Sequence, residues 1–180
     1  DIKFVIPNEV VRDQIYTYLL DTYKESNLTF EAYSKNKLEC GLAYDGDYKP
    51  YFEYIADCLK RFSSQRDKQK GEAYVHGFTL AMTSQCSFYR PISELDNDGG
   101  YADIFLSPLC DIYKDMTDSY IIELKYCNSG TSDRQMKKLF DEAAAQVCRY
   151  ADSDIVRESV KTTKLHRLVV LYRGTEMAKC

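Results

Sequence analysis

The sequence predicts an α/β fold, a mixed central sheet flanked by helices, with a helical region in front of it. Two patterns predict this class. From residue 69 onward, segments with helical and with strand-like apolar spacing follow in the order helix, strand, strand, strand, helix, strand. Before that point, apolar residues recur only at helical spacing. We therefore expect a helical region over residues 1–67 and an αβββαβ core over residues 68–180.

The helical region is expected to hold three helices. Asn8 can cap the first, and the second covers residues 29–39. A turn around Gly46 separates the second from the third, over residues 50–64, in which Pro50 takes the first helical position. No set of candidate catalytic side chains stands out among them. We therefore expect these helices to form a packing layer or a surface for a partner.

The core begins with a helix over residues 69–84 and a strand over residues 87–95. Two further strands are expected at residues 101–106 and 120–126. The connection between these two is rich in Asp, Lys, Thr and Ser, which favours an antiparallel hairpin with a long loop.

The second half of the core is a helix followed by a strand. Ser132 and Gln135 have the spacing of a capping box, which places a helix start there. Apolar residues at helical spacing carry this helix to Ala151. The run over residues 165–172 is almost continuously apolar, as expected of a strand covered on both faces.

Two charged residues interrupt the strand over residues 120–126. Glu123 and Lys125 lie two positions apart, so both point to the same face of the strand. Burying a carboxylate and an ammonium is costly unless the two are paired or bind an ion. The interruption therefore indicates either a functional site or a structural ion pair at the end of the sheet.

Asp103 is the only acid in the preceding strand. In an antiparallel hairpin it could lie across from Glu123. Two neighbouring carboxylates raise each other's pKa unless a cation lies between them. Oxygen ligands suit Mg²⁺ or Mn²⁺, whereas two histidines without clustered cysteines make a poor zinc site.

The order Asp103, Glu123, Lys125 resembles the signature of the PD-(D/E)XK nuclease superfamily, with Ala102 in place of the Pro of its name. Among the members of this superfamily, the chain is similar to the bacterial DUF1703-type nuclease domains that follow an AAA-ATPase-like module. The segments that carry this resemblance are Ile6–Val10, Gly71–His76, Gly99–Ile104, Ile121–Lys125 and Glu142–Gln146.

The resemblance implies a restriction-endonuclease-like core and a metal-dependent nuclease that hydrolyses phosphodiester bonds. Asp103, Glu123 and the backbone carbonyl of Leu124 would hold Mg²⁺ or Mn²⁺. Lys125 would position the attacking water or help to deprotonate it, and would stabilise the developing negative charge. These roles come from the resemblance and not from the spacing alone.

Two helix residues join the set through the same resemblance. Glu72 matches an acid on the first core helix that could bind the metal or one of its waters. Gln146 matches a polar position on the later helix that points back at the site. Each has an ordinary alternative: Glu72 as a solvent-facing helix acid, and Gln146 as a core amide bonded to backbone.

Charge and partners leave the function open between three classes. The net charge of −4 counts against a simple nucleic-acid binder, but acidic metal ligands contribute to it. The first class is a nuclease whose partner is nucleic acid, DNA more than RNA. The second is an inactive nuclease-fold module that binds nucleic acid or a protein partner. The third is a small structural domain whose acids bind no metal.

The setting of the chain also follows from its residues. It begins at Asp1 without an initiator Met, so we expect an upstream ATPase-like module in the same protein, and a homodimer stays open. Seven scattered cysteines without CxxC pairs favour reduced thiols and a cytoplasmic location. No apolar run approaches the roughly 20 residues that span a bilayer, so no membrane contact is expected.

Overall fold

The computed structural model describes residue 14 and residues 32–62, 71–97 and 100–180. The helix expected after Asn8 lies outside the described residues. So do Ile6–Val10 and Gly99, which belong to the segments that resemble the nuclease domains. Within the described part of the chain, no helix has the length and apolar character needed to cross a bilayer.

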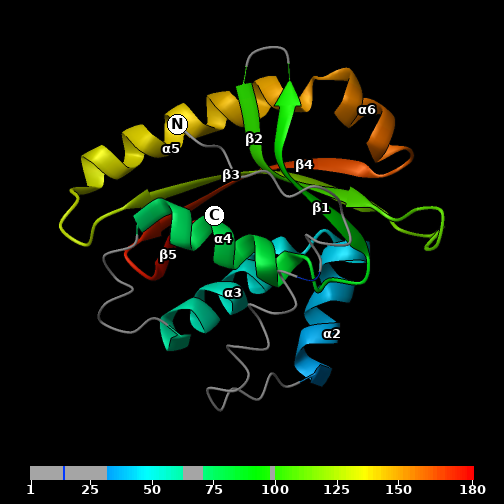
Figure 1. Cartoon of the computed structure of the whole chain (residues 1–180), viewed down its shortest axis with the longest axis horizontal. Helices are drawn as coiled ribbons and strands as arrows, with labels where there is room; N and C mark the ends of the chain where they lie inside the picture. The colour runs from blue at the N-terminus through cyan, green and yellow to red at the C-terminus, as the bar shows by residue number, and fades with distance from the viewer. Residues whose placement is uncertain (1–13, 15–31, 63–70, 98–99) are drawn as a thin grey trace.

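A five-stranded mixed sheet forms the middle of the molecule, in the order β1-β2-β3-β4-β5 (Figure 1). Each strand is antiparallel to its neighbour except for β3 and β4, which run parallel. This confirms the predicted α/β class and the predicted β2–β3 hairpin. The strands are β1 Tyr89–Asn97, β2 Gly100–Pro108, β3 Asp118–Cys127, β4 Lys164–Arg173 and β5 Glu176–Lys179.

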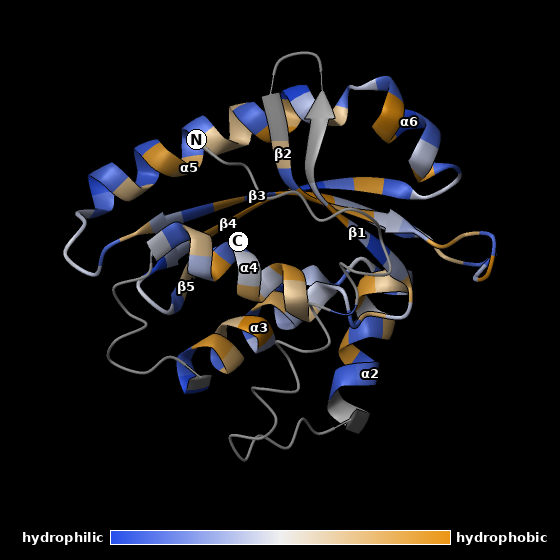
Figure 2. Cartoon of the chain, in the orientation of Figure 1, coloured by the Kyte–Doolittle hydropathy of each residue, from blue (hydrophilic) through white to orange (hydrophobic). Residues whose placement is uncertain are grey.

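Helices cover both faces of the sheet (Figure 1). One face carries α2 (Ala32–Cys40), the π-helical turn η1 (Gly41–Asp45), α3 (Tyr48–Phe62) and α4 (Gly71–Thr83). The other carries α5 (Asp133–Ala151) and α6 (Asp154–Val160). In Figure 2, hydrophobic and hydrophilic positions alternate along α5, as expected of a helix with one buried and one exposed side.

The side chains of β3 divide between two apolar clusters. Ile122 and Leu124 pack with the helices α3 and α4. Ile121 points to the opposite face and packs with Ala143 and Val147 of α5. Because side chains alternate along a strand, Glu123 and Lys125 belong to the α5 face.

The N-terminal helices share their cluster with the core. Leu42, Phe52, Ile55 and Leu59 are fully buried in the cluster that includes Ile122. The expectation of a packing layer is thus met for residues 42–59, whereas the division of the chain at residue 67 stays a prediction.

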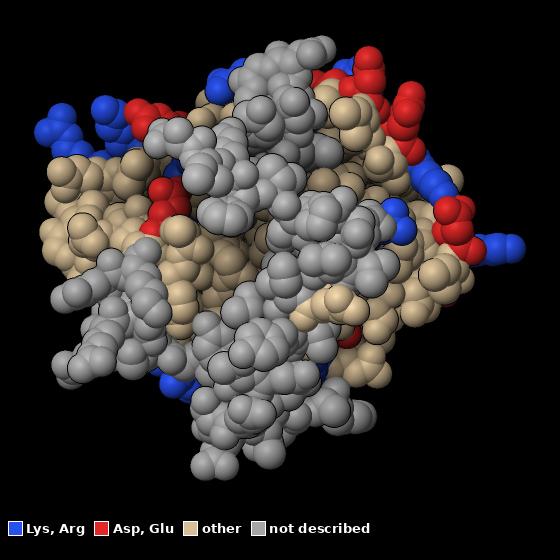
Figure 3. Space-filling model, in the orientation of Figure 1, with Lys and Arg blue, Asp and Glu red and all other residues tan. Residues whose placement is uncertain are grey.

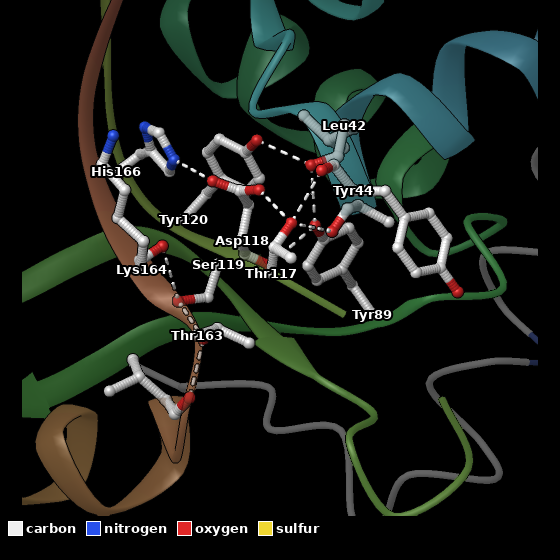
Figure 4. A network of polar contacts seen from close by, with 12 residues as sticks. Leu42, Tyr44, Tyr89, Thr117, Asp118, Ser119, Tyr120, Thr163, Lys164 and His166 are labelled. Carbon is white, nitrogen blue, oxygen red and sulfur yellow. Dashed lines mark hydrogen bonds and ion pairs between the residues drawn. The ribbon is translucent and has the colours of Figure 1, made fainter. Parts of the chain in front are cut away.

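A polar network ties η1 to the sheet at the end away from Lys125 (Figure 4). The Tyr120 hydroxyl donates to the Leu42 carbonyl at 2.7 Å, and the Tyr89 hydroxyl lies 3.1 Å from the same oxygen. His166 bonds the buried carboxylate of Asp118 and stacks on the Tyr120 ring. These contacts explain two buried tyrosines and a buried Asp in structural terms.

The elements differ from the prediction in three places. Helix α3 begins at Tyr48, so Pro50 takes its third position and not its first. The short helix α6 and the four-residue strand β5 were not expected. Strand β4 is buried only over Leu168–Tyr172, and its first four residues are partly or fully exposed.

Candidate active site

The strands β2 and β3 separate beside the predicted acids. Their backbone ladder ends at the pair Ile104 and Ile122, and the same register would next place Asp103 opposite Glu123. At that point the Leu124 amide donates to Asp103 Oδ2 at 2.8 Å. A side chain of β2 therefore bonds the main chain of β3 at the fork between the two strands.

Glu123 and Lys125 form an ion pair, which was one of the two interpretations that the strand pattern left open. Lys125 Nζ lies 2.8 Å from Glu123 Oε1, and the side chains are 22% and 4% exposed. The other carboxylate oxygen, Glu123 Oε2, is buried and has no hydrogen-bond partner among the described residues. Buried polar atoms are rarely left unpaired, so this oxygen is available to accept from a water or to bind a cation.

The charges of this group act on one another. Burial raises the pKa of Glu123; the Lys125 hydrogen bond opposes that shift, and the negative charges of Asp103 and Glu72 add to it. Burial lowers the pKa of Lys125, but the hydrogen bond and charge of Glu123 outweigh it and raise that pKa above its usual value. Lys125 is therefore held in its protonated form, and Glu123 is a carboxylate that gains from a nearby cation.

Three of the predicted residues line one pocket. Glu72 of α4, Lys125 of β3 and Gln146 of α5 share a pocket of about 580 Å³. Asp103 and Glu123 do not line it; Lys125 connects the pocket to Glu123. The other lining residues are Tyr126, Leu139, Glu142, Ala145 and Arg149.

Tyr126 and Arg149 were missed by the sequence analysis. Glu142, Gln146 and Arg149 recur at helical spacing, so their shared face of α5 could have been found from the sequence. Nothing in the strand pattern distinguished Tyr126 from the other aromatic residues. Tyr150, one turn after Gln146, packs instead into the apolar cluster beneath α5.

A second pocket, of about 820 Å³, adjoins the first because Tyr126 lines both. It lies at the carboxyl ends of the parallel strands β3 and β4, the edge at which α/β sheets commonly bind ligands. Its lining is mostly polar: Lys60, Asn128, Ser129, Arg173, Gly174, Thr175 and Glu176. Lys60 and Glu176 form an exposed ion pair at 2.8 Å.

The donor set decides which metal could fit. Among the described residues, no three His, Cys, Asp or Glu side chains come together to hold a metal ion. A cation would therefore rest on Asp103 and Glu123 together with backbone or water oxygens. Mg²⁺ is commonly bound through one or two carboxylates and several waters, so the two acids and the unpartnered Glu123 oxygen fit such an ion.

The described part of the surface carries basic side chains at the start of α5. Arg134, Lys137 and Lys138 are exposed near the start of α5, as expected of a solvated helix face. In Figure 3, acidic and basic side chains are interspersed over the coloured part of the face shown.

One comparison with known proteins identifies a family. A family model described as the PD-(D/E)XK nuclease superfamily matches residues 70–180. The matched range takes in α4, all five strands, α5 and α6, and with them every predicted site residue. Searches of curated proteins and of solved structures find no match.

Proposed function

The chain belongs to the PD-(D/E)XK nuclease superfamily, and we propose that it is a metal-dependent nuclease that hydrolyses phosphodiester bonds of nucleic acid. The observation that carries the proposal is the buried Glu123 beside Asp103 and Lys125, whose Oε2 has no hydrogen-bond partner among the described residues. Members of this superfamily act on nucleic acid and generally use divalent ions. The ion, the substrate and the residue roles below are proposals.

Asp103 and Glu123 would hold Mg²⁺ or Mn²⁺, with the Leu124 carbonyl as a third oxygen. A bound divalent cation supplies charge neutralisation at phosphorus and lowers the pKa of a bound water. The hydrogen bond from the Leu124 amide fixes the direction of the Asp103 carboxylate. The negative charge of Glu72 raises the pKa of Glu123, but Glu72 does not complete a group of three metal-ligating side chains among the described residues. Glu72 would therefore contact the metal through a water.

Lys125 would act as a cation and not as a general base. Its pKa is raised by Glu123, so it keeps its proton and can stabilise the negative charge that develops on the phosphate. Its side chain is partly exposed and lines the pocket, within reach of a substrate. Gln146 could then orient a water or a phosphate oxygen from the α5 side.

The substrate strand would run across Tyr126 from the first pocket into the second. Bases stack on aromatic side chains with little sequence preference, which suits Tyr126 between the two pockets. Arg149 in the first pocket could contact a flanking phosphate, whereas Arg173 in the second pocket donates to the carbonyls of Ser129 and Thr131. We expect DNA to be cut in preference to RNA.

The test is cleavage of labelled single- and double-stranded DNA and RNA in Mg²⁺ or Mn²⁺. Wild type is compared with Lys125→Ala and Asp103→Asn, and Lys164→Ala is the matched control because it removes an exposed lysine from the far end of β4. We expect cleavage that requires the metal, disappears in the first two variants and persists in the control. The Asp103→Asn change would keep an acceptor for the Leu124 amide, so its loss of activity would report the charge.

Three results would contradict the proposal. Cleavage that Lys125→Ala leaves unchanged would come from another site or from a contaminant. Absence of cleavage together with metal-dependent binding of nucleic acid would favour the inactive nuclease-fold module instead. Absence of both cleavage and metal-dependent binding would favour the third class, a small structural domain whose acids bind no metal.

The wider setting is part of the same proposal. An upstream ATPase-like module, a homodimeric state and a cytoplasmic location rest on the sequence alone. Cleavage by a longer protein that needs ATP, where this chain alone is inactive, would support the module.

A further inference from the structure

The imidazole of His76, on α4, bonds the main chain of β2 beside the candidate metal ligands. Its Nε2 atom lies 3.1 Å from the backbone carbonyl oxygen of Asp103. A carbonyl can only accept a hydrogen bond, so in this contact Nε2 carries the proton and donates it. The sequence showed a histidine on a helix, but nothing in it showed which atom that histidine would bond.

The bonded carbonyl belongs to the residue at which β2 leaves β3. The ladder between the two strands ends one residue away, at Ile104 and Ile122. Beyond its end, ladder bonds no longer hold the main chain of β2 against β3. The contact from His76 supplies a fixed point for β2 where that pairing stops.

Asp103 is thereby held at two points. His76 bonds its main-chain carbonyl, and the Leu124 amide bonds its side-chain Oδ2 at 2.8 Å. The first bond fixes where the residue lies, and the second fixes where its carboxylate points. If β2 moved at the fork, the carboxylate would leave the Leu124 amide and its place near Glu123.

The same helix carries Glu72 one turn before His76. Residues four apart on a helix share one face, so the contact with Asp103 also sets where Glu72 lies relative to the fork. Glu72 lines the first pocket together with Lys125. One hydrogen bond thus joins the helix that forms one wall of the pocket to the strand that bears the first acid.

We propose that His76 is a positioning residue. It holds Asp103, and with it the candidate metal site, in the arrangement that binds the metal. The inference deepens the proposed function and rests on it for the metal. His76 would touch neither the substrate nor the metal and would act through the Asp103 main chain. Residues that orient metal ligands commonly affect metal affinity roughly tenfold to a hundredfold when they are changed.

The test compares His76→Ala and His76→Gln with wild type. Gln is the conservative change because its side-chain amide can place an N–H near the position of the imidazole Nε2–H. Tyr120→Phe is the matched control, since it also removes one side-chain hydrogen bond to a carbonyl, but at the far end of the sheet. The readouts are amide hydrogen exchange at Leu124 and Ile122, and Mn²⁺ affinity by calorimetry.

In His76→Ala, we expect the amide hydrogen-exchange rate of Leu124 to rise roughly tenfold, which is the effect expected from the loss of one hydrogen bond. The Mn²⁺ affinity should fall by at least the same factor. Exchange at Ile122, in the last pair of the ladder, should change much less. His76→Gln should restore both readouts. Tyr120→Phe should leave Mn²⁺ affinity at the wild-type value.

Unchanged Leu124 exchange in His76→Ala would overturn the inference. So would a His76→Gln variant no better than His76→Ala, because the donated hydrogen bond would then not be the cause. If wild type binds no Mn²⁺, the metal site of the proposed function fails. The exchange of Leu124 then decides the role of His76 by itself.

Discussion

Removal of residues 1–67 is expected to unfold the rest of the chain. The sequence places the core at residues 68–180, yet one face of the sheet is covered by side chains from before that boundary. Leu42, Phe52, Ile55 and Leu59 are each 0% exposed and pack in one cluster with Ile122. A chain that starts at residue 68 would keep α4 but would present to water the part of this apolar face that η1 and α3 cover.

The size of the loss follows from the burial. Each of these four side chains contributes about 1.5–3 kcal/mol, so together they supply about 6–12 kcal/mol, taken as an upper value. A typical domain is stable by only about 5–15 kcal/mol. The hydrogen bonds from Tyr89 and Tyr120 to the Leu42 carbonyl would be lost as well.

The assay is urea unfolding of the full chain and of residues 68–180. Unfolding is monitored by circular dichroism and by the chemical-shift dispersion of the amide NMR signals. The full chain should unfold cooperatively, whereas the shorter chain should show no cooperative transition. Point variants calibrate the argument: Phe52→Ala should cost about 3–5 kcal/mol, and the exposed neighbour Glu53→Ala should stay within about 0.5 kcal/mol.

A shorter chain that unfolds cooperatively with nearly the full stability would refute this reasoning. It would mean that the sheet face tolerates solvent or is covered in another way. The boundary at residue 67 would then separate two independent units.

Two further predictions concern the metal and the backbone. Burial raises the pKa of Glu123, and so does the charge of Asp103, so protons compete for this carboxylate at a higher pH than for an ordinary Glu. Mn²⁺ affinity measured by calorimetry should therefore fall as pH is lowered through that raised pKa, and an affinity independent of pH would exclude Glu123 as a ligand. Gly46 has φ +66°, and a Cβ there would meet Asp118 Oδ1 at 3.1 Å, so Gly46→Ala should destabilise the protein by about 1–2 kcal/mol. Gly77→Ala, with nothing within 4 Å of the new Cβ, should stabilise α4 by about 0.5–1 kcal/mol. Urea unfolding in which Gly46→Ala and Gly77→Ala change the free energy of unfolding in the same direction would contradict the prediction.

Local signals predicted the long elements well. The spacing of Ser132 and Gln135 predicted the start of α5, and the structure has both bonds of the capping box there. The apolar runs of β3 and β4 are long enough for their patterns to be unambiguous. Such elements carry most of their information in their own residues.

Short elements depend on their neighbours and were missed. Helix α6 has only seven residues, fewer than an isolated helix needs to be stable. Strand β5 has four residues and pairs with β4 across a register shift. Neither pattern stands out before the surrounding structure supplies the contacts.

The candidate site was predicted in part for a related reason. Glu123 and Lys125 stood out because charges interrupt an apolar strand, and the hairpin suggested Asp103 as their neighbour. The inclusion of Glu72 and Gln146 came from resemblance, and the structure places both at the same pocket as Lys125. The contact of His76 with Asp103 joins residues 27 positions apart, which no local pattern encodes.

The state of Glu123 favours the proposed cation site over a purely structural ion pair. A pair that serves only stability gains most when every buried oxygen is bonded, because an unpaired buried carboxylate oxygen is costly. Lys125 bonds Oε1, and in the described part of the chain Oε2 is buried without a hydrogen-bond partner at the point where β2 leaves β3. A continuous sheet could have placed an apolar side chain there at no such cost. The fork and the unpartnered oxygen occur together in the described part of the chain, which is the arrangement that the proposed cation site requires.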